Sequence, residues 1–275
     1  MPNHLSAAYH QLKRLLRARP ATSTQSPYPP IRNFVLDILT EGRRKNTIQL
    51  LLEVDAKAIR AQIAKIAAQS GDKISITSYV AGVLARTVAA APLMHAYLHK
   101  GRELVMFADV DLSVMVEREV DGVLLPLPFI VRAANQKSFA QIKNALAQAK
   151  SAELYADGPL SALESTFFSL PRALRRIVWY FARRDAHLFR ELAGTVGITS
   201  MGMHATGRAI VIPITPMTLT LSIGTIYAHP AIREGVLIEQ ESLQLNLSAD
   251  HDIIDGAPLM RFAAAFQENL ERGMA

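Results

Sequence analysis

One histidine of the sequence stands where it could do acid–base chemistry. Residues 245–249 alternate apolar and polar side chains, as a half-buried strand does, and His251 follows that strand. A histidine at a strand end can face a cleft, and its imidazole can accept and return a proton near neutral pH. Asp255, four residues later, could anchor the turn by pairing with a cation. Gly256 would allow a tight entry into the next helix.

Two other interpretations of this segment stay open from the residues alone. His251 could be a structural histidine of a loop. Several metal-binding side chains also cluster here, but adjacent side chains at a strand end point to opposite faces, and no second histidine lies at a ligand spacing. We therefore expect no metal. The residues of the metal alternative are Asp250, His251, Asp252 and Asp255.

The elements that must position these residues predict an α+β fold with a mixed sheet, because strands and helices do not alternate strictly. Ser75 or Thr77 could cap a buried helix that Pro92 ends. Asp121-Gly122 predicts a turn, and Pro126 and Pro128 place the following strand at a sheet edge. The predicted strands lie within 47–55, 103–131, 194–202, 209–226 and 235–250. The predicted helices cover 56–69, 78–91, 138–150 and 257–272.

Four stretches, in this order along the chain, resemble the catalytic domain of 2-oxo acid dehydrogenase acyltransferases and chloramphenicol acetyltransferase. Residues 46–55 are like the family's first core strand, and 119–142 resemble its Gly-Leu-hydrophobic-Val-Pro segment. GTVGITSMG at 194–202 resembles the family's Gly-Thr-Phe-Thr-Ile-Ser-Asn-Leu-Gly stretch. About fifty residues later, 250–256 match its Asp-His-x-x-x-Asp-Gly stretch. The resemblance covers about 31–272 and implies a two-layer fold with helices packed on one side of a mixed sheet.

This resemblance assigns catalytic roles to two positions. His251 matches the family's general base, which would take the proton of a thiol or hydroxyl acceptor. Thr199 matches the hydroxyl that hydrogen-bonds the oxyanion of the tetrahedral intermediate. Ser200 takes that role if the alignment is shifted by one residue. Taken alone, a threonine in a strand would carry no such meaning.

The resemblance also implies a structural role for Asp255. In the family, the matching aspartate holds the active-site turn through an arginine. We expect Arg32 to be that partner, with Arg43 and Arg44 as alternatives. Gly256 would complete the turn.

The implied activity is transfer of an acyl group from a thioester donor, coenzyme A or acyl carrier protein, to a thiol, hydroxyl or amine. Coenzyme A thioester would be a co-substrate, without metal or a lipoyl group on this chain. Because the family's site forms between subunits, we expect a homotrimer or a multiple of it. The sequence departs from the family by carrying Asp252 where arginine is usual, and by lacking lipoyl and subunit-binding domains. The alternative is a scaffold or binding protein of the same fold, catalytically reduced and membrane-peripheral.

Composition is that of a globular protein: 275 residues, 50% of them hydrophobic, with no cysteine. The lack of cysteine excludes disulfides, thiolate metal sites and a cysteine nucleophile. No apolar run is long enough to span a bilayer, and charged residues interrupt the N-terminus where a signal peptide would be apolar. We expect a cytoplasmic protein.

The net charge of +6 comes from two basic segments. Residues 4–19 predict a basic helix, followed by a Pro- and Ser-rich linker, so we divide the chain into 1–30 and a catalytic domain at 31–275. Residues 160–192 form a basic helical insertion, in which we expect one apolar side to pack over the core. The alternative is docking to coenzyme A phosphates, an acidic acyl carrier protein or an anionic membrane. Nucleic acid is not expected, because no nucleic-acid-binding motif is present. The apolar side consists of Leu174, Ile177, Val178 and Phe181.

Overall fold

The computed structural model describes residues 32–120, 123–151, 170–200 and 207–274, together with isolated positions 9, 12, 13, 24, 28, 29, 167 and 205. The chain divides into two units, Met1–Pro30 and Ile31–Ala275. Most of the expected helix at 4–19, the turn at 121–122 and the first part of the basic insertion lie outside the described residues. Within the described part, no helix is long and apolar enough to cross a membrane.

The larger unit is built on a six-stranded mixed sheet with the order β1-β8-β7-β6-β4-β5. The central β6 runs parallel to both of its neighbours, whereas the other pairs are antiparallel. The β5 strand lies at the edge, where its two prolines remove no hydrogen bond from an inner ladder. The strands are β1 (Thr47–Asp55), β4 (Leu112–Val120), β5 (Val123–Val131), β6 (Val196–Ser200), β7 (Leu219–Arg233) and β8 (Val236–Asp250), and a separate hairpin joins β2 (Tyr97–His99) and β3 (Glu103–Val105).

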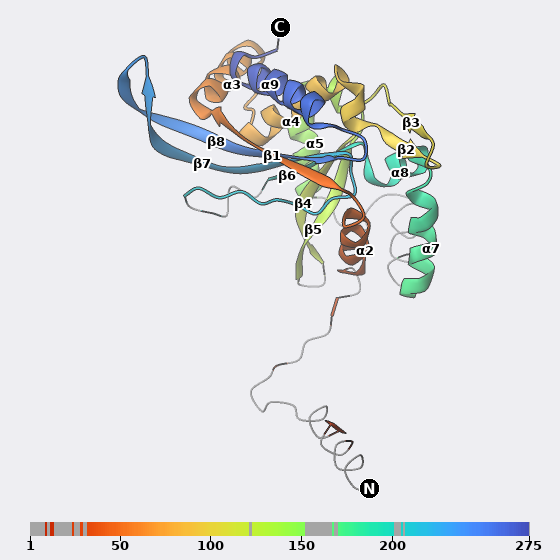
Figure 1. Cartoon of the computed structure of the whole chain (residues 1–275). Coiled ribbons are helices and arrows are strands. Elements are labelled where there is room, and N and C mark those ends of the chain that lie inside the picture. The colour runs from red at the N-terminus through yellow and green to blue at the C-terminus, as the bar shows by residue number, and fades with distance from the viewer. Residues whose placement is uncertain are drawn as a thin grey trace. The chain divides into compact units, whose positions relative to one another are not determined.

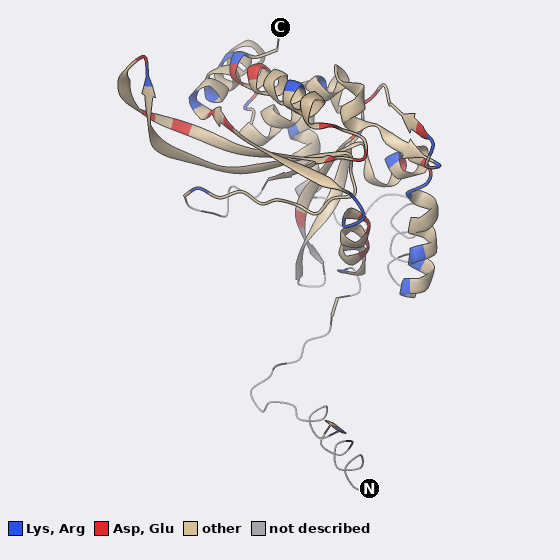
Figure 2. Cartoon of the chain, viewed as in Figure 1, with Lys and Arg blue, Asp and Glu red and all other residues tan. Residues whose placement is uncertain are grey.

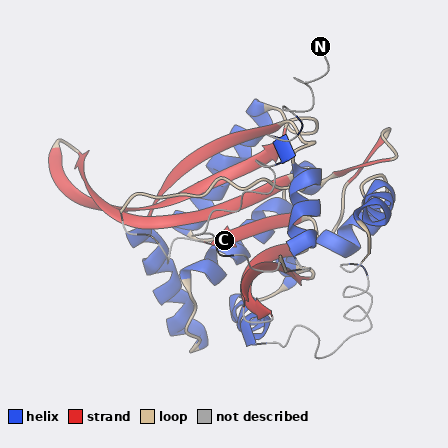
Figure 3. Cartoon of the chain, turned by 90° about the horizontal axis from the view of Figure 1, so that it is seen from below, coloured by secondary structure: helices blue, strands red, loops and turns tan. Residues whose placement is uncertain are grey.

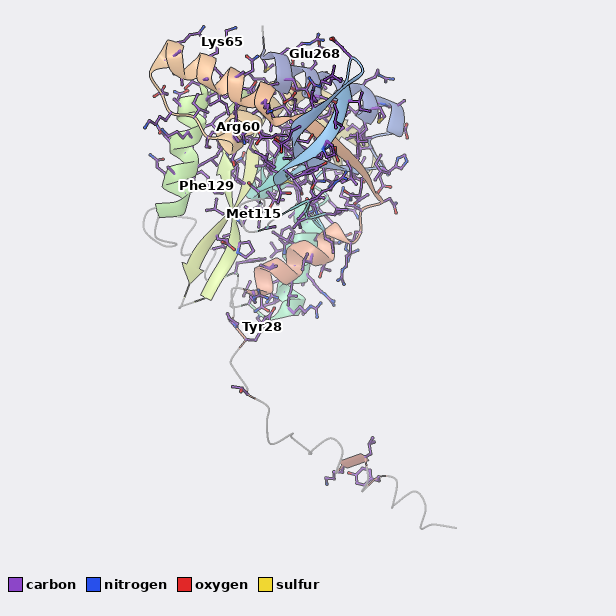
Figure 4. All side chains as sticks on the ribbon, turned by 90° about the vertical axis from the view of Figure 1, so that its left-hand side faces the viewer. Tyr28, Arg60, Lys65, Met115, Phe129 and Glu268 are labelled. Carbon is purple, nitrogen blue, oxygen red and sulfur yellow. The ribbon has the colours of Figure 1, made fainter. Side chains whose placement is uncertain are left out.

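One face of the sheet carries the main hydrophobic core. The strand period of two places Leu243, Leu245 and Leu247 of β8 in this core, while Asn246 and Ser248 face the other way. Four helices cover this face, as the sequence predicted, and Figure 1 shows them above the sheet. Arg60 and Lys65, labelled in Figure 4, belong to one of these helices. The four helices are α3 (Ala56–Ser70), α4 (Ile76–Ala89), α5 (Phe139–Ser151) and α9 (Gly256–Arg272).

Three further helices lie outside that layer. They are α2 (Arg32–Gly42), α7 (Arg172–Ala182) and α8 (Ala186–Ala193). α2 packs on α7, α7 on α8, and α8 on β2. Figure 3 looks toward the sheet from the side on which α2 lies. The sequence did not predict α2. It also predicted a strand from residue 209, but the strand begins only at Leu219, because Pro213 and Pro216 cannot donate to a ladder.

The orientation of α7 corrects the expected packing of the basic insertion. Its inner face is formed by Arg175, Trp179 and Ala182, whereas the apolar side that we expected in the core is turned outward. Arg175 is buried because its guanidinium pairs with Asp37 of α2, with Nε 2.7 Å from Oδ2. This ion pair ties α7 to α2 and satisfies a charge that would otherwise be costly to bury. The outward apolar side chains are Leu174, Ile177, Val178 and Phe181, each 40–61% exposed.

Candidate active site

His251 lies in a turn that two hydrogen bonds attach to Asn46, the residue before β1. Its backbone N–H donates to the carbonyl of Asn46 at 2.7 Å. The amide of Asn46 donates in turn to Asp252 at 2.8 Å. The backbone N–H of Ile254 returns to the carbonyl of Asp250 at 2.9 Å, which closes the turn before α9. The turn is therefore fixed to the sheet independently of the histidine side chain.

An ion pair between Lys45 and Asp250 locks this turn. Lys45 Nζ lies 2.5 Å from Asp250 Oδ2, and the Asp250 side chain is fully buried. The sequence predicted an arginine pair with Asp255 for this purpose. Instead, Asp255 is 84% exposed and, in the described part of the chain, forms no ion pair with an arginine. Arg32 begins α2 and Arg44 pairs with Glu41. Arg43 is exposed beside it.

The His251 side chain is half exposed, as a base that meets a substrate must be. Asp255 Oδ1 lies 3.7 Å from Nδ1 of the imidazole. That distance is too long for a direct hydrogen bond. Gly256 follows and begins α9 with open space around it. Among the described residues, no three metal-binding side chains come together.

Thr199 and Ser200 are neighbours at the end of β6 and line a cavity of about 860 Å³. Both side chains are partly buried. Gly197, two residues earlier on the same strand, allows the side chain of Thr220 to pack close, since a Cβ there would come within 2.6 Å of Thr220 Oγ1. In the described part of the chain, the Thr199 hydroxyl has no hydrogen-bond partner within the protein, so it is available to a ligand.

A single chain does not bring Thr199 and His251 together. Thr199 pairs with Ser222 on β7, which pairs with Asn246 on β8. Two strand spacings and the four residues from Asn246 to Asp250 separate Thr199 from the end of β8 by about 16 Å. His251 does not line the cavity that Thr199 lines. A general base and an oxyanion donor must each lie within about 3 Å of reacting atoms, so these two cannot act on one substrate within one chain.

The comparisons with known proteins agree with this architecture. The sequence profile of the 2-oxoacid dehydrogenases acyltransferase (catalytic domain) matches residues 20–167 and 175–274. The chain belongs to this family. The interruption at 168–174 coincides with the start of α7. Of the predicted site residues, Thr199, His251 and Asp255 all lie in the matched part. By family, the chain is an acyltransferase catalytic domain.

The chain is similar to one curated protein and to several solved structures. The dihydrolipoyllysine-residue acetyltransferase component of the acetoin cleaving system of Bacillus subtilis (strain 168) is 22% identical over 269 residues, which are 94% of this chain and 59% of that protein. The chain thus spans about three-fifths of this curated relative. The fold matches a probable dihydrolipoamide acetyltransferase from Listeria monocytogenes 4b F2365, with a TM-score of 0.68 at 16% identity, over 92% of this chain and 97% of that one. It also matches Azotobacter vinelandii dihydrolipoamide acetyltransferase, with a TM-score of 0.65 at 18% identity, over 92% and 96%.

Lys45 and Asn46 hold the turn that carries His251, and the sequence did not predict either contact. Both precede β1, two hundred residues away from the turn that they hold. The contacts follow from the pairing of β1 with β8, which places Thr47 opposite Asp250. That register becomes visible only when the two strands are known to be neighbours.

Proposed function

We propose that the protein transfers an acyl group from a thioester donor, with His251 as general base and Thr199 as oxyanion donor. His251 Nε2 takes the proton of the acceptor thiol, hydroxyl or amine as that atom attacks the thioester carbonyl. The carbonyl oxygen becomes an oxyanion, which accepts a hydrogen bond from Thr199. Collapse of the intermediate breaks the carbon–sulfur bond, and the imidazolium returns its proton to the departing thiolate. The donor is an acyl thioester of coenzyme A or of an acyl carrier protein.

The spacing of the three residues supports these roles. In the Azotobacter vinelandii enzyme, a serine, a histidine and an asparagine with roles in the catalytic mechanism are separated by 52 and 4 residues. Thr199, His251 and Asp255 have the same two spacings here. The spacing favours Thr199 over Ser200, and a threonine hydroxyl can donate the hydrogen bond that a serine hydroxyl donates. The third position is an aspartate in this chain, where that enzyme has an asparagine.

We also propose that the working form is a homotrimer or a multiple of it, in which neighbouring chains share each site. The separation of Thr199 from the His251 turn within one chain supports this proposal. A second subunit could place its Thr199 beside His251 of the first. Light scattering at micromolar concentration tests the assembly, and a stable, fully active monomer would contradict both the trimer and the shared site.

The experiment that tests the activity is turnover of a panel of acyl-coenzyme A and acyl carrier thioesters, read as release of free thiol. His251→Ala should lower the rate by about 10²–10⁴ without unfolding the protein. His229→Ala is the matched control, because His229 lies on β7 away from Thr199 and the His251 turn, and it should retain full activity. Equal rates for His251→Ala and the parent would remove His251 as base. Absence of turnover with every donor would favour the alternative, a scaffold or binding protein of the same fold.

The outer face of α7 favours an anionic membrane surface as a docking partner. Helical geometry places the four exposed apolar side chains on one flank of α7 and Arg172 and Arg176 on the other. Figure 2 shows basic residues on α7. Arg172 and Arg176 form no ion pair within the described part of the chain. An exposed apolar flank beside uncompensated arginines complements anionic headgroups over acyl chains. An acidic carrier protein is the competing outcome of the test given below.

A further inference from the structure

The cavity beside Thr199 has an apolar wall on the side away from the sheet. α2 contributes Val35 and Ile38, and α7 contributes Trp179. Ile214, from the segment before β7, and Leu192 of α8 complete this side. Met115 on β4, labelled in Figure 4, belongs to the sheet side of the same cavity. With about 860 Å³, the space lies in the upper part of the range typical for small-molecule sites.

Part of this apolar wall is open to solvent. Leu192 and Ile214 are 46% and 45% exposed although both line the cavity. Apolar surface that lines a cavity is the usual lining of a binding site, and its exposure has a cost that an apolar ligand removes. Each methylene that such a wall takes out of water contributes about a fourfold gain in affinity.

Trp179 forms a closed, packed part of this wall. Its side chain is only 7% exposed, and its indole Nε1 is buried without a hydrogen-bond partner in the described part of the chain. The helix that carries Trp179 is fixed to α2 by the buried Arg175–Asp37 pair, so this wall is rigid. The indole N–H is closed off from solvent, so the ring offers only apolar surface to the cavity.

We propose that this cavity binds a long aliphatic acyl chain, so that the substrate is a fatty acyl thioester rather than an acetyl thioester. This inference rests on the proposed acyl transfer, because Thr199 in the sheet wall marks the end where the thioester carbonyl would lie. Trp179, Val35 and Ile38 line the region that receives the chain. The start of α7, where the family match is interrupted, belongs to the helix that builds this wall.

Trp179 is the single tryptophan of the sequence, so its fluorescence reports directly on the cavity. Bromine atoms on an acyl chain quench tryptophan on contact. We expect 9,10-dibromostearoyl-coenzyme A, below the concentration at which it forms micelles, to quench the emission with a saturable curve. Unlabelled stearoyl-coenzyme A should compete for the site, whereas acetyl-coenzyme A should not displace the brominated chain at equal concentration.

A narrowing substitution provides the matched comparison. Val35 lines the cavity and belongs to neither hydrophobic cluster, so Val35→Phe should fill space without disturbing a core. It should weaken binding of the brominated thioester at least tenfold. Val236→Phe, at the exposed tip of the β7–β8 hairpin, is the same chemical change away from the cavity and should bind as the parent does.

The outcomes separate this inference from the proposed activity. Quenching by the brominated chain without turnover of any thioester would retain the acyl site and refute the transfer. Turnover of acetyl-coenzyme A, with no quenching and no gain in kcat/KM from acetyl to decanoyl, would retain the transfer and overturn the acyl site. Absence of quenching would also follow if a neighbouring subunit fills the cavity, and that result equally overturns the proposal.

Discussion

Removing the charge of Lys45 should destabilise the protein strongly, although the Lys45 side chain is partly exposed. Lys45→Met keeps most of the side-chain volume but leaves the carboxylate of Asp250 without its cation. Asp250 is fully buried, and within the described residues its carboxylate accepts one further hydrogen bond, from the backbone N–H of Asp252 at 3.2 Å. Breaking a buried pair by removing one partner costs about 3–5 kcal/mol. Because Lys45 is 26% exposed and water can reach its ammonium group, we expect the lower end, about 3 kcal/mol.

Urea unfolding at pH 7 measures this loss as a lower midpoint at an unchanged m-value. Lys65→Met on α3 is the matched control, because Lys65 is exposed and makes no ion pair in the described part of the chain. It should change the free energy of unfolding by less than about 0.5 kcal/mol. The double variant Lys45→Met with Asp250→Asn removes both charges and should recover part of the loss.

The same substitution should lower turnover in the folded protein, because His251 directly follows Asp250. Its kcat should fall more than its KM rises, since the base is misplaced while the cavity at Thr199 is untouched. Two results would refute this reasoning. One is a Lys45→Met variant within 1 kcal/mol of the parent. The other is a double variant whose loss equals the sum of the two single losses, which would mean that the charges do not interact.

Three further predictions address the site, the docking surface and the core. Thr199→Ala should lower kcat by about 10²–10³ with little change in KM, whereas Ser200→Ala should not, and the reverse result would shift the assignment by one residue. Reversing Arg172 and Arg176 to glutamate should weaken binding to anionic lipid vesicles, measured by co-sedimentation, while small thioesters still turn over. Added salt should weaken the binding of the parent protein. Binding to an acidic carrier protein but not to vesicles would contradict the membrane proposal. Burial lowers the pKa of His95 to about 4, with Arg190 acting in the same direction. Stability from neutral His95 is therefore present above pH 6.5 and is lost as pH falls toward 4, by up to about 3 kcal/mol, and urea unfolding of His95→Gln should lack this pH dependence.

Local sequence determined the elements whose patterns need no distant partner. Residues 47–55 form β1 with the predicted bounds, because a β-branched and apolar run ends at Asp55, whose carboxylate caps α3. Ser75 caps α4 as expected. Pro126 and Pro128 placed β5 at an edge, since proline has no N–H for an inner ladder. The motif around His251 indicated the family, which the matched profile confirms.

Tertiary structure decided what depends on contacts between distant segments. The periodicity of α7 showed that it has an apolar flank but not which side would be buried, and the ion pair of Arg175 with Asp37 turned that flank outward. Lys45 forms the ion pair that holds the His251 turn because β1 pairs with β8. The spacing of residues along the chain does not predict that register. The resemblance implied a site between subunits, but the distance of Thr199 from His251 within one chain follows only from the strand order of the sheet. Local patterns specify what each segment can form, whereas the packing of segments far apart in sequence determines which charges meet and which surfaces enclose a cavity.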